Sequence, residues 1–263
     1  MDLPGVALIT GAASGIGRAT SILFAAEGCK KIVIVDVARP GLERTGSLLA
    51  EHHPDATVLA LEADLRSEQA VENLVEQAVA KFGRIDYCCN IAGIVLHGST
   101  LETKTSDWEL QYEVNLRGVF FCERAELRRI LGQEPLKSRD SKYAFRGVIV
   151  NVSSLAGLMA YPDLAAYSAF KHGVCGLSKS DAMKYGPQGV RINTVCPGAV
   201  ATPITQNLPD MEPEQMTKLL ASTGLGRVAD PEELAEAIVW MCSGRASFVN
   251  GASLSVNGGR NGF

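Results

Sequence analysis

The chain has 263 residues, of which 46% are hydrophobic and 21% charged, and its formal net charge is −4. These values are ordinary for a globular protein with a sizeable core, and they exclude the basic surplus typical of proteins that bind nucleic acid or anionic membranes. The sequence has no apolar run of the ~18 residues that a membrane span needs, and its start, MDLPGVALITG, lacks the basic region of a signal peptide. We therefore expect a soluble, cytoplasmic protein that binds neither nucleic acid nor membrane.

Short runs rich in β-branched residues alternate along the chain with longer stretches of helical periodicity. Strands are predicted at VALIT (6–10), KIVIVD (31–36), TVLALEA (57–63), IDYCC (85–89), GVIVNVS (147–153), VRINTVC (190–196) and ASLSV (252–256). Helices are predicted at about 15–28, 40–53, 67–82, 107–131, 165–185 and 231–243. This alternation indicates an α/β protein, a Rossmann-type doubly wound parallel sheet of about seven strands with helices on both faces. No linker or repeat divides the chain, so we expect residues 1–263 to form a single domain.

The segment ERAELRRILGQEPLKSRDSKYAFR (123–146) is more highly charged and longer than a short connection requires. We interpret it as the end of a helix followed by an exposed excursion before the strand at 147. A solvated loop is the simpler interpretation, and contact with a partner is the alternative.

Three glycines, Gly11, Gly15 and Gly17, separate the first predicted strand from the first predicted helix. Glycines at this point permit a tight turn and the close approach of a pyrophosphate to the backbone, at the positive end of the helix. Asp36 ends the next strand, 19 residues after Gly17, which is the spacing at which a carboxylate binds an adenosine ribose. Together these features predict a dinucleotide site.

The surroundings of Asp36 favour NAD over NADP. Its negative charge would repel the 2′-phosphate of NADP, and neither Ser14 nor Val37 is basic. Arg39 lies close enough in the sequence to act in the opposite direction.

The cysteines and histidines do not form a metal motif. The seven cysteines are scattered without a CxxC pair, and no histidine stands at zinc-ligand spacing from them. We expect reduced, buried thiols in a reducing compartment and no bound metal.

The stretch YSAFK (167–171) places Tyr167 and Lys171 on the same face of a predicted helix, one turn apart. Taken singly, such residues are more often a packed ring and a solvated charge, and the preceding pair Ser153 and Ser154 is commonly a turn or cap. Joined at these intervals behind a dinucleotide loop, they indicate an acid–base site.

Six motifs in this order and spacing identify a family resemblance. TGAASGIG, NIAG, VNLRG, NVSSLAG, YSAFK and CPGAVAT resemble the motifs of the short-chain dehydrogenase/reductase family, over nearly the whole chain from Val6 to about Gly259. The resemblance implies that Tyr167 is the general acid/base, that Lys171 binds the nicotinamide ribose, and that Ser154 hydrogen-bonds the substrate oxygen. It further implies that Asn115 holds a water linking Lys171 to solvent.

The resemblance also implies a set of cofactor-binding residues. Asp64 and Leu65 would face the adenine, and Ile91 stands where the family commonly has an asparagine. The whole set is Gly11, Ser14, Gly15, Ile16, Gly17, Asp36, Asp64, Leu65, Asn90, Ala92, Gly93, Tyr167, Lys171, Pro197, Gly198, Val200 and Thr202. In this group Asn90, Ala92 and Gly93 would line the adenosine side, and the last four residues would face the nicotinamide carboxamide.

Hydride transfer at a carbinol or carbonyl carbon requires a proton to move at the oxygen. Tyrosine, with a pKa of about 10, is a poor base near neutral pH. We expect the positive charges of Lys171 and of the oxidised nicotinamide to lower the pKa of Tyr167. Ser154 would donate to the developing alkoxide.

Three stretches, 94–102, 155–166 and 204–224, are expected to wall a substrate pocket, with the segment 200–224 as its lid. Met159, Tyr161, Leu208, Met211 and Met216 would make it apolar, and no arginine cluster offers to hold a phosphate or carboxylate. We expect a medium-sized hydrophobic secondary alcohol or ketone, such as a terpenoid, steroid-like or polyketide-derived metabolite. Ordinary packing of these methionines is the alternative. The long excursion resembles that of family members in fungal secondary metabolism.

Rival functions and the state of assembly follow from the same resemblance. The scaffold can host a non-redox dehydration, isomerisation or cyclisation, or serve as a nonenzymatic dinucleotide sensor, and the intact catalytic motifs argue against both. A serine hydrolase is disfavoured because the sequence has no G-x-S-x-G motif. VCGLSKSDAMKY and VNGASLSVNGG match the helix and strand through which family members form tetramers, so a homotetramer is implied, with a dimer as the alternative.

Overall fold

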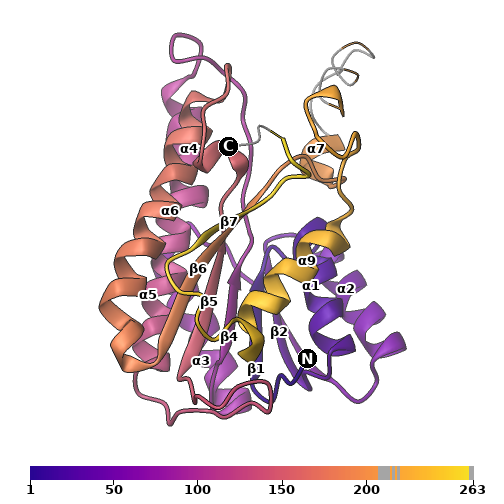
Figure 1. Cartoon of the computed structure of the whole chain (residues 1–263), viewed down its shortest axis with the longest axis vertical. Helices are drawn as coiled ribbons and strands as arrows, with labels where there is room; N and C mark the ends of the chain where they lie inside the picture. Colours follow the sequence, from indigo (N-terminus) through magenta and orange to yellow (C-terminus); the bar gives the residue numbers. More distant parts are fainter. Residues whose placement is uncertain (207–213, 215–216, 218–219, 261–263) are drawn as a thin grey trace.

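Seven parallel strands form one sheet in the computed structural model of the protein, which describes residues 1–206, 214, 217 and 220–260 (Figure 1). The strand order is β3-β2-β1-β4-β5-β6-β7. The strands are β1 (Val6–Thr10), β2 (Lys31–Asp36), β3 (Thr57–Glu62), β4 (Tyr87–Asn90), β5 (Gly147–Val152), β6 (Val190–Pro197) and β7 (Ser253–Val256). Each lies within two residues of its predicted bounds, and the predicted doubly wound parallel sheet is confirmed.

The central strands are buried on both faces because helices cover both sides of the sheet. Every residue of β1 and β5 is buried. In the sheet register, Leu8 of β1 lies between Val33 of β2 and Cys88 of β4. Near-continuous apolar, β-branched runs such as VALIT are the sequence that a doubly covered sheet requires.

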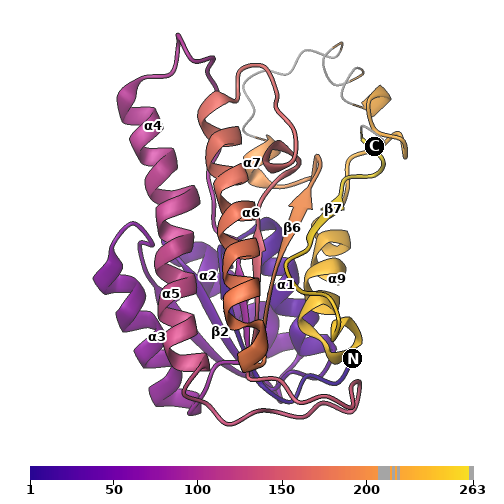
Figure 2. The ribbon, with the colours of Figure 1, turned by 60° about the vertical axis from the view of Figure 1, so that its left-hand side comes forward.

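Two groups of helices cover the two faces (Figures 1 and 2). They are α1 (Gly15–Ala26), α2 (Arg39–His52) and α9 (Pro231–Cys242) on one face, and α3 (Glu68–Phe82), α5 (Gly118–Ile130) and α6 (Ala165–Tyr185) on the other. Phe24 of α1 and Ile238 of α9 belong to one hydrophobic core, and Leu74 of α3 and Cys122 of α5 belong to a second. The sheet therefore separates two cores, each closed by its own helices.

The predicted helix at 107–131 is interrupted rather than continuous. It consists of α4 (Thr105–Tyr112), a π-helical turn η1 (Glu113–Arg117) and α5. At the end of the turn the Gly118 N–H donates to the Glu113 carbonyl, five residues back. Such turns often mark functional sites, and this one carries Asn115. Hydrophobic periodicity does not predict it because the backbone is helical on both sides.

The excursion after α5 lies away from the carboxyl ends of the strands, beside the N-terminus (Figure 1). Leu136 and Phe145 pair across it in an isolated antiparallel bridge, and Phe145 is buried in the core. The Ser138 hydroxyl donates to the Asp2 carbonyl over 2.9 Å. The simpler interpretation of the sequence was a solvated loop. In the structure, the excursion is instead partly packed.

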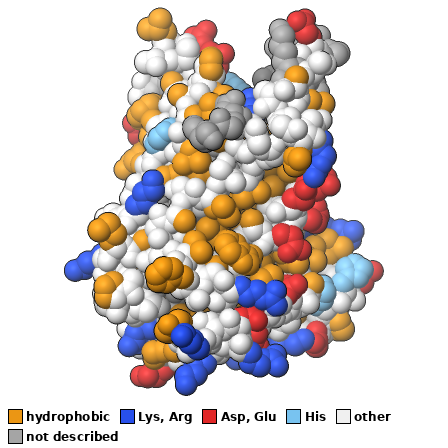
Figure 3. Space-filling model, viewed as in Figure 1, with side chains coloured by type: hydrophobic (Ala, Val, Ile, Leu, Met, Phe, Trp, Pro, Cys, Tyr) orange, Lys and Arg blue, Asp and Glu red, His pale blue; other side chains and the backbone are white. Residues whose placement is uncertain are grey.

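The strand order reverses between β1 and β4, which places a crevice at the carboxyl ends of these strands. The space-filling view shows the molecule hollowed at this end (Figure 3). In the part of the chain that the structure describes, no helix is long and apolar enough to cross a membrane.

Candidate active site

The glycine-rich turn after β1 adopts conformations that require glycine. Gly11 and Gly15 have φ angles of +71° and +48°. A Cβ on Gly17 would lie 2.1 Å from the Gly11 carbonyl oxygen, so only glycine lets α1 pack this closely against the turn. The spacing of the three glycines is therefore set by the strand–turn–helix geometry.

The amino end of α1 offers an anion site. Ser14 is its N-cap, but the Ser14 side chain makes no capping hydrogen bond. The first N–H groups of a helix lack intrahelical partners and carry a partial positive charge. A cavity of about 510 Å³, the first cavity, lies against this turn. Its glycine cradle fits the pyrophosphate of a dinucleotide.

Most predicted cofactor residues line the first cavity. They are Gly11, Ser14, Gly15, Ile16, Gly17, Asp36, Asp64, Leu65, Ala92, Gly93 and Thr202. Asn90 is not among the residues that line it. Its buried side-chain amide donates instead to Glu126 Oε2 (3.1 Å) and to Asn151 Oδ1 (2.9 Å), and contact of Asn90 with the adenosine side stays a prediction.

Asp36 ends β2 at the rim of the first cavity. Its Oδ2 accepts from the Ala13 N–H (3.0 Å) and its Oδ1 from the Ala38 N–H (2.9 Å). Arg39 is turned toward other carboxylates, with 3.2 Å between its Nε and Glu43 Oε1 and 3.7 Å between its Nη1 and Glu62 Oε2. The basic residue nearest to Asp36 in the sequence is therefore already paired.

Asp64 and Arg66 both line the first cavity and form an ion pair. The Arg66 Nη2 lies 2.7 Å from Asp64 Oδ2, and its Nε donates to both carboxylate oxygens. These hydrogen bonds hold the pKa of Asp64 below its ordinary value. The ion pair fixes the position of the Asp64 carboxylate, which the sequence motif does not define.

A second cavity, of about 680 Å³, adjoins the first. Five residues line both: Ile16, Ile91, Gly93, Thr202 and Ile204. The predicted residues Ser154, Tyr167, Lys171, Pro197, Gly198 and Val200 also line the second cavity. The structure thus brings segments from β5, α6 and β6 to one wall beside the first cavity.

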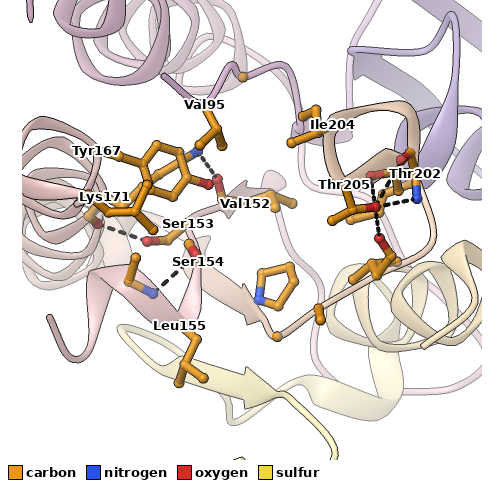
Figure 4. Close-up of a pocket in the computed structure, with 18 of the residues that line it drawn as sticks. Val95, Val152, Ser153, Ser154, Leu155, Tyr167, Lys171, Thr202, Ile204 and Thr205 are labelled. Atoms are coloured by element: carbon orange, nitrogen blue, oxygen red, sulfur yellow. Dashed lines mark hydrogen bonds between the residues drawn. The ribbon is translucent and has the colours of Figure 1, made fainter. Parts of the chain in front are cut away.

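Tyr167 and Lys171 project from α6 toward the end of β5, as the close-up shows (Figure 4). Lys171 Nζ donates to the Val152 carbonyl over 3.0 Å and lies 5.7 Å from the centre of the Tyr167 ring. Ser154 caps the short turn η2 (Leu155–Gly157), its Oγ accepting from the Ala156 N–H over 3.1 Å. Thr202 and α7 (Pro203–Gln206) form the opposite side of the cavity (Figure 4).

The two serines before η2 differ in their surroundings. Ser153 is buried, and its hydroxyl donates to the Lys171 carbonyl over 2.8 Å. A Cβ on Gly157 would lie 2.2 Å from the same hydroxyl oxygen. Ser153 therefore ties α6 to β5, whereas Ser154 is the partly exposed member of the pair.

Burial has the largest effect on the pKa values of Tyr167 and Lys171. It raises the pKa of Tyr167 to about 12, although a hydrogen bond with Ser154 acts in the opposite direction. Burial also lowers the pKa of Lys171 to about 8. In the chain by itself the pKa of Tyr167 thus lies above its ordinary value, because desolvation of the phenolate outweighs the hydrogen bond with Ser154. The expected fall, which includes the charge of the oxidised nicotinamide, stays a prediction.

Asn115 lies behind Lys171 and lines neither cavity. Its Nδ2 donates to the Ile94 carbonyl (2.8 Å), and its Oδ1 accepts from the Ile94 N–H (2.9 Å). The position of a Cβ on Gly93 is 3.1 Å from Asn115 Oδ1 and 3.4 Å from Lys171 Nζ. The π turn thus clamps the loop that follows β4 against Lys171, and both the nitrogen and the oxygen of the Asn115 amide hydrogen-bond to Ile94.

The residues that line the second cavity agree only in part with those predicted from the sequence. Val95, Tyr161, Leu164 and Ile204 come from the predicted stretches, whereas Met159 is not among the lining residues. The predicted Leu208, Met211 and Met216 lie outside the described residues. Arg260 lines the cavity too, although no motif in VNGGRNGF points to it.

All seven cysteines are free and buried. Among the described residues, no group of three or more histidine, cysteine, aspartate or glutamate side chains could hold a metal ion. The groups available for chemistry at the site are therefore hydroxyl, ammonium and carboxylate groups.

Comparison with known proteins agrees with this geometry. A family model described as enoyl-(acyl carrier protein) reductase matches residues 11–261. "Short-chain dehydrogenase anuF" of Penicillium roqueforti is 35% identical over 98% of this chain and 96% of its own length. The chain belongs to the short-chain dehydrogenase/reductase family.

Solved structures of the short-chain dehydrogenase/reductase family share the fold. The crystal structure of levodione reductase has a TM-score of 0.89 and 34% identity, covering 97% of this chain and 96% of its own. That of 3-ketoacyl-(acyl-carrier-protein) reductase from Brucella melitensis, complexed with NADH, has a TM-score of 0.84 and 33% identity, covering 97% and 98%. The chain is thus an oxidoreductase of a family in which a nicotinamide cofactor is typical.

Proposed function

We propose that the protein is an NAD-dependent dehydrogenase that interconverts a secondary alcohol and a ketone. The observation that carries the proposal is the shared wall of the two cavities. Five residues, Gly93 and Thr202 among them, line both cavities, and Ser154, Tyr167 and Lys171 line the second. A substrate in the second cavity would have its oxygen beside a phenol and a hydroxyl, next to the bound cofactor.

Tyr167 is the proposed general acid/base. With its pKa raised to about 12, the phenol is protonated near neutral pH, which suits proton donation to the oxygen of a ketone. When bound, a nicotinamide ring supplies or accepts the hydride and, in its oxidised form, brings a positive charge. For alcohol oxidation Tyr167 must first lose its proton, and positive charge near the ring favours the phenolate.

Ser154 and Lys171 complete the proton chemistry. The Ser154 hydroxyl donates to the oxygen that becomes an alkoxide and so stabilises it. Lys171, held by the Val152 carbonyl and by the loop that Asn115 clamps, stays beside the Tyr167 ring. Asn115 is then a positioning residue that acts through Lys171.

The preference for NAD is supported by the charges at the rim of the first cavity. The Asp36 carboxylate is fixed by two main-chain N–H groups and is directed to accept hydrogen bonds from ribose hydroxyls. A 2′-phosphate would meet this negative charge. Arg39, the residue that could offset it, is engaged with Glu43 and Glu62.

The substrate is proposed to be a medium-sized, largely apolar molecule. The second cavity, at about 680 Å³, lies within the ~300–1,000 Å³ range of small-molecule sites, and the nicotinamide would occupy the part beside Pro197, Gly198 and Thr202. Val95, Leu155, Leu164 and Ile204 contribute apolar walls. A cyclic terpenoid, steroid-like or polyketide-derived alcohol fits these walls, and the name levodione reductase indicates a ketone substrate for that relative.

The decisive experiment incubates the protein with NAD⁺ and a panel of secondary alcohols, and follows the absorbance of the reduced nicotinamide. Tyr167→Phe is the matched control. It should keep the fold and NAD binding but lose turnover by about 10²- to 10⁴-fold, the usual contribution of general acid–base catalysis. Near-normal turnover by this variant would reject the assignment. Absence of any redox signal across the panel, with NAD bound, would favour a non-redox reaction.

We also propose that residues 1–263 form one domain and assemble as a homotetramer. The sheet draws strands from Val6 to Val256, which supports a single folding unit. Exposed apolar side chains on α5 and α6 (Phe120 and Met183) and near β7 (Phe248) support contacts between subunits. The seven buried free thiols support a reducing, cytoplasmic location.

A further inference from the structure

The C-terminal segment after β7 places a guanidinium at the second cavity. The Asn257 amide donates to the Arg260 carbonyl over 2.9 Å, which fixes the backbone of Arg260. The Leu225 N–H donates to the Gly258 carbonyl over 2.9 Å. The position of a Cβ on Gly198, a residue of the cavity wall, lies 2.9 Å from the Asn257 Cα. The turn that carries Arg260 is therefore packed onto that wall.

Arg260 is stacked on an aromatic ring of the same cavity. Its Cζ lies 4.9 Å from the centre of the Tyr161 ring, and both residues line the cavity and are half-buried. In the described part of the chain, Arg260 has no carboxylate within 4.0 Å, and no aspartate or glutamate lines this cavity. A stacked guanidinium keeps its N–H groups free at its edge for a planar anion.

The Tyr161 hydroxyl has no hydrogen-bond partner among the described residues. Its oxygen is buried nonetheless. A buried hydroxyl without a partner costs free energy, which a hydrogen bond to a ligand in the cavity would offset. A cation and a hydroxyl donor thus lie together on one part of the wall.

We propose that Arg260 and Tyr161 form an anion subsite that binds a carboxylate of the substrate, at a different part of the substrate from its alcohol carbon. This inference rests on the proposed function and narrows its substrate class to hydroxy acids and keto acids with an apolar body. A carboxylate matches the planar fork of one arginine in a bidentate pair. A cofactor phosphate does not account for the subsite, because the glycine cradle belongs to the first cavity and Arg260 does not line it.

The carboxylate also changes the balance of charge in the cavity. Among the described residues that line the cavity, the cations are Lys171 and Arg260, and Lys171 is engaged with the Val152 carbonyl. A substrate carboxylate would pair with Arg260, which has no carboxylate partner among the residues that the structure describes. The sequence alone predicts an apolar pocket without such a group, because a lone arginine in a glycine-rich tail carries no motif.

The test compares three alcohols that share one ring: a hydroxycyclohexanecarboxylate, its methyl ester and its primary amide. We expect the wild-type protein to prefer the carboxylate over both neutral compounds by about tenfold in kcat/KM, since charge-assisted hydrogen bonds contribute modestly at a partly exposed site. Arg260→Gln should abolish the preference, because kcat/KM for the carboxylate should fall to about that of the neutral compounds. Tyr161→Phe, which keeps the ring, should reduce the preference by less.

Arg245→Gln is the matched control. Arg245 lies 3.6 Å from Asp140 and lines neither cavity, so its replacement should leave the preference intact. A second readout is calorimetric binding of cyclohexanecarboxylate and cyclohexanecarboxamide to the protein with NAD⁺, where no reaction occurs. The carboxylate should bind more tightly to the wild-type protein and lose that advantage in Arg260→Gln.

The outcomes separate this inference from the proposed function. Equal turnover and binding of charged and neutral compounds by the wild-type protein, or a preference that survives Arg260→Gln, overturns the anion subsite. Tyr167-dependent oxidation of the ester would then still support the dehydrogenase. If no alcohol is oxidised, the proposed function fails. The calorimetric comparison of cyclohexanecarboxylate with cyclohexanecarboxamide then decides by itself whether the anion subsite exists. The wild-type binding comparison also decides it if Arg260→Gln does not fold.

Discussion

The Asp36 carboxylate is oriented before any nucleotide binds, because two main-chain N–H groups hold its two oxygens. A side chain held in this way loses little conformational entropy on binding ribose. The same rigidity prevents it from turning away from a 2′-phosphate. We therefore propose that discrimination between NAD and NADP depends on Asp36 and on the pairing of Arg39 with Glu43 and Glu62.

Replacing Asp36 by Ala is expected to weaken NAD binding by about 10- to 100-fold, the cost of losing hydrogen bonds to a charged group. NADP binding should change much less or improve, because the repulsion is removed as well. Fluorescence titration of the protein with each cofactor measures the ratio. Asp55→Ala, which removes an exposed carboxylate paired with Lys30, is the control. An unchanged NAD to NADP ratio in Asp36→Ala would refute the discrimination argument.

The positions of the site residues follow from the sequence more reliably than their energetics. The intervals between Ser154, Tyr167 and Lys171 correspond to a strand end and one helical turn, so their convergence is predictable. The pKa of Tyr167 is not, because it depends on desolvation by residues distant in the sequence. Asn90 shows the same limit, since its partner Glu126 lies 36 residues away.

At the scale of elements, α5 carries two buried carboxyl groups against the sheet. Glu126 accepts from the Asn90 amide over 3.1 Å, and Glu123 accepts from the Asn151 amide. Asn151 also donates to the Ser178 hydroxyl of α6 over 2.8 Å. The network joins β4, β5, α5 and α6, and burial raises the pKa of both glutamates, that of Glu126 to about 7.

This burial predicts a pH-dependent stability. The pKa of Glu126 rises from 4.5 to about 7 on folding. Its contribution to the stability of the fold is therefore fully present below pH 4.5 and is lost as the pH rises through 7. Between pH 4.5 and pH 7, the free energy of unfolding of the Glu126→Gln variant should therefore increase relative to that of the wild type, by about 3 kcal/mol in total. Urea unfolding at several pH values measures this difference. The exposed Glu236→Gln should follow the wild type, and a parallel course for Glu126→Gln would contradict the assignment.

The elements themselves were predictable wherever one period governs a stretch. Helix α3 is an example, with the Ser67 hydroxyl accepting from the Ala70 N–H at its start and Gly83, with a φ of +83°, after its end. The π turn at Glu113–Arg117 was not, because one inserted residue leaves the apolar pattern on either side intact. Its consequence, the contact of Asn115 with Ile94, depends on the loop that follows another strand.

For the whole molecule, segments distant in the sequence meet at places that no local pattern reveals. Arg260 reaches the wall formed by Gly198, and the excursion after α5 packs its Phe145 into the core beside the N-terminus. Parallel connectivity and hydrophobic burial predict the sheet and its two layers of helices. They do not predict where a tail or a long loop comes to rest, since its position depends on a few contacts.

The outer faces of the molecule lead to a prediction about assembly. The face bearing β7 and α9 shows a run of apolar side chains, and Trp240 and Phe248 are 36% and 102% exposed (Figure 3). On the opposite layer Phe120 of α5 and Met183 of α6 are 41% and 83% exposed. We propose that each face pairs with the same face of another subunit, and two such contacts would generate a closed tetramer.

We expect analytical ultracentrifugation to show a tetramer of the wild type, and we expect Met183→Arg to reduce it to dimers. The substitution places a charge in the α5–α6 contact and leaves the β7–α9 contact intact, and an unpaired charge at a buried interface costs several kcal/mol. Leu101→Arg, at a side chain that is 98% exposed on a loop before α4, should remain tetrameric. A monomeric wild type, or a Met183→Arg variant that stays tetrameric, would show that these helices do not form the contact.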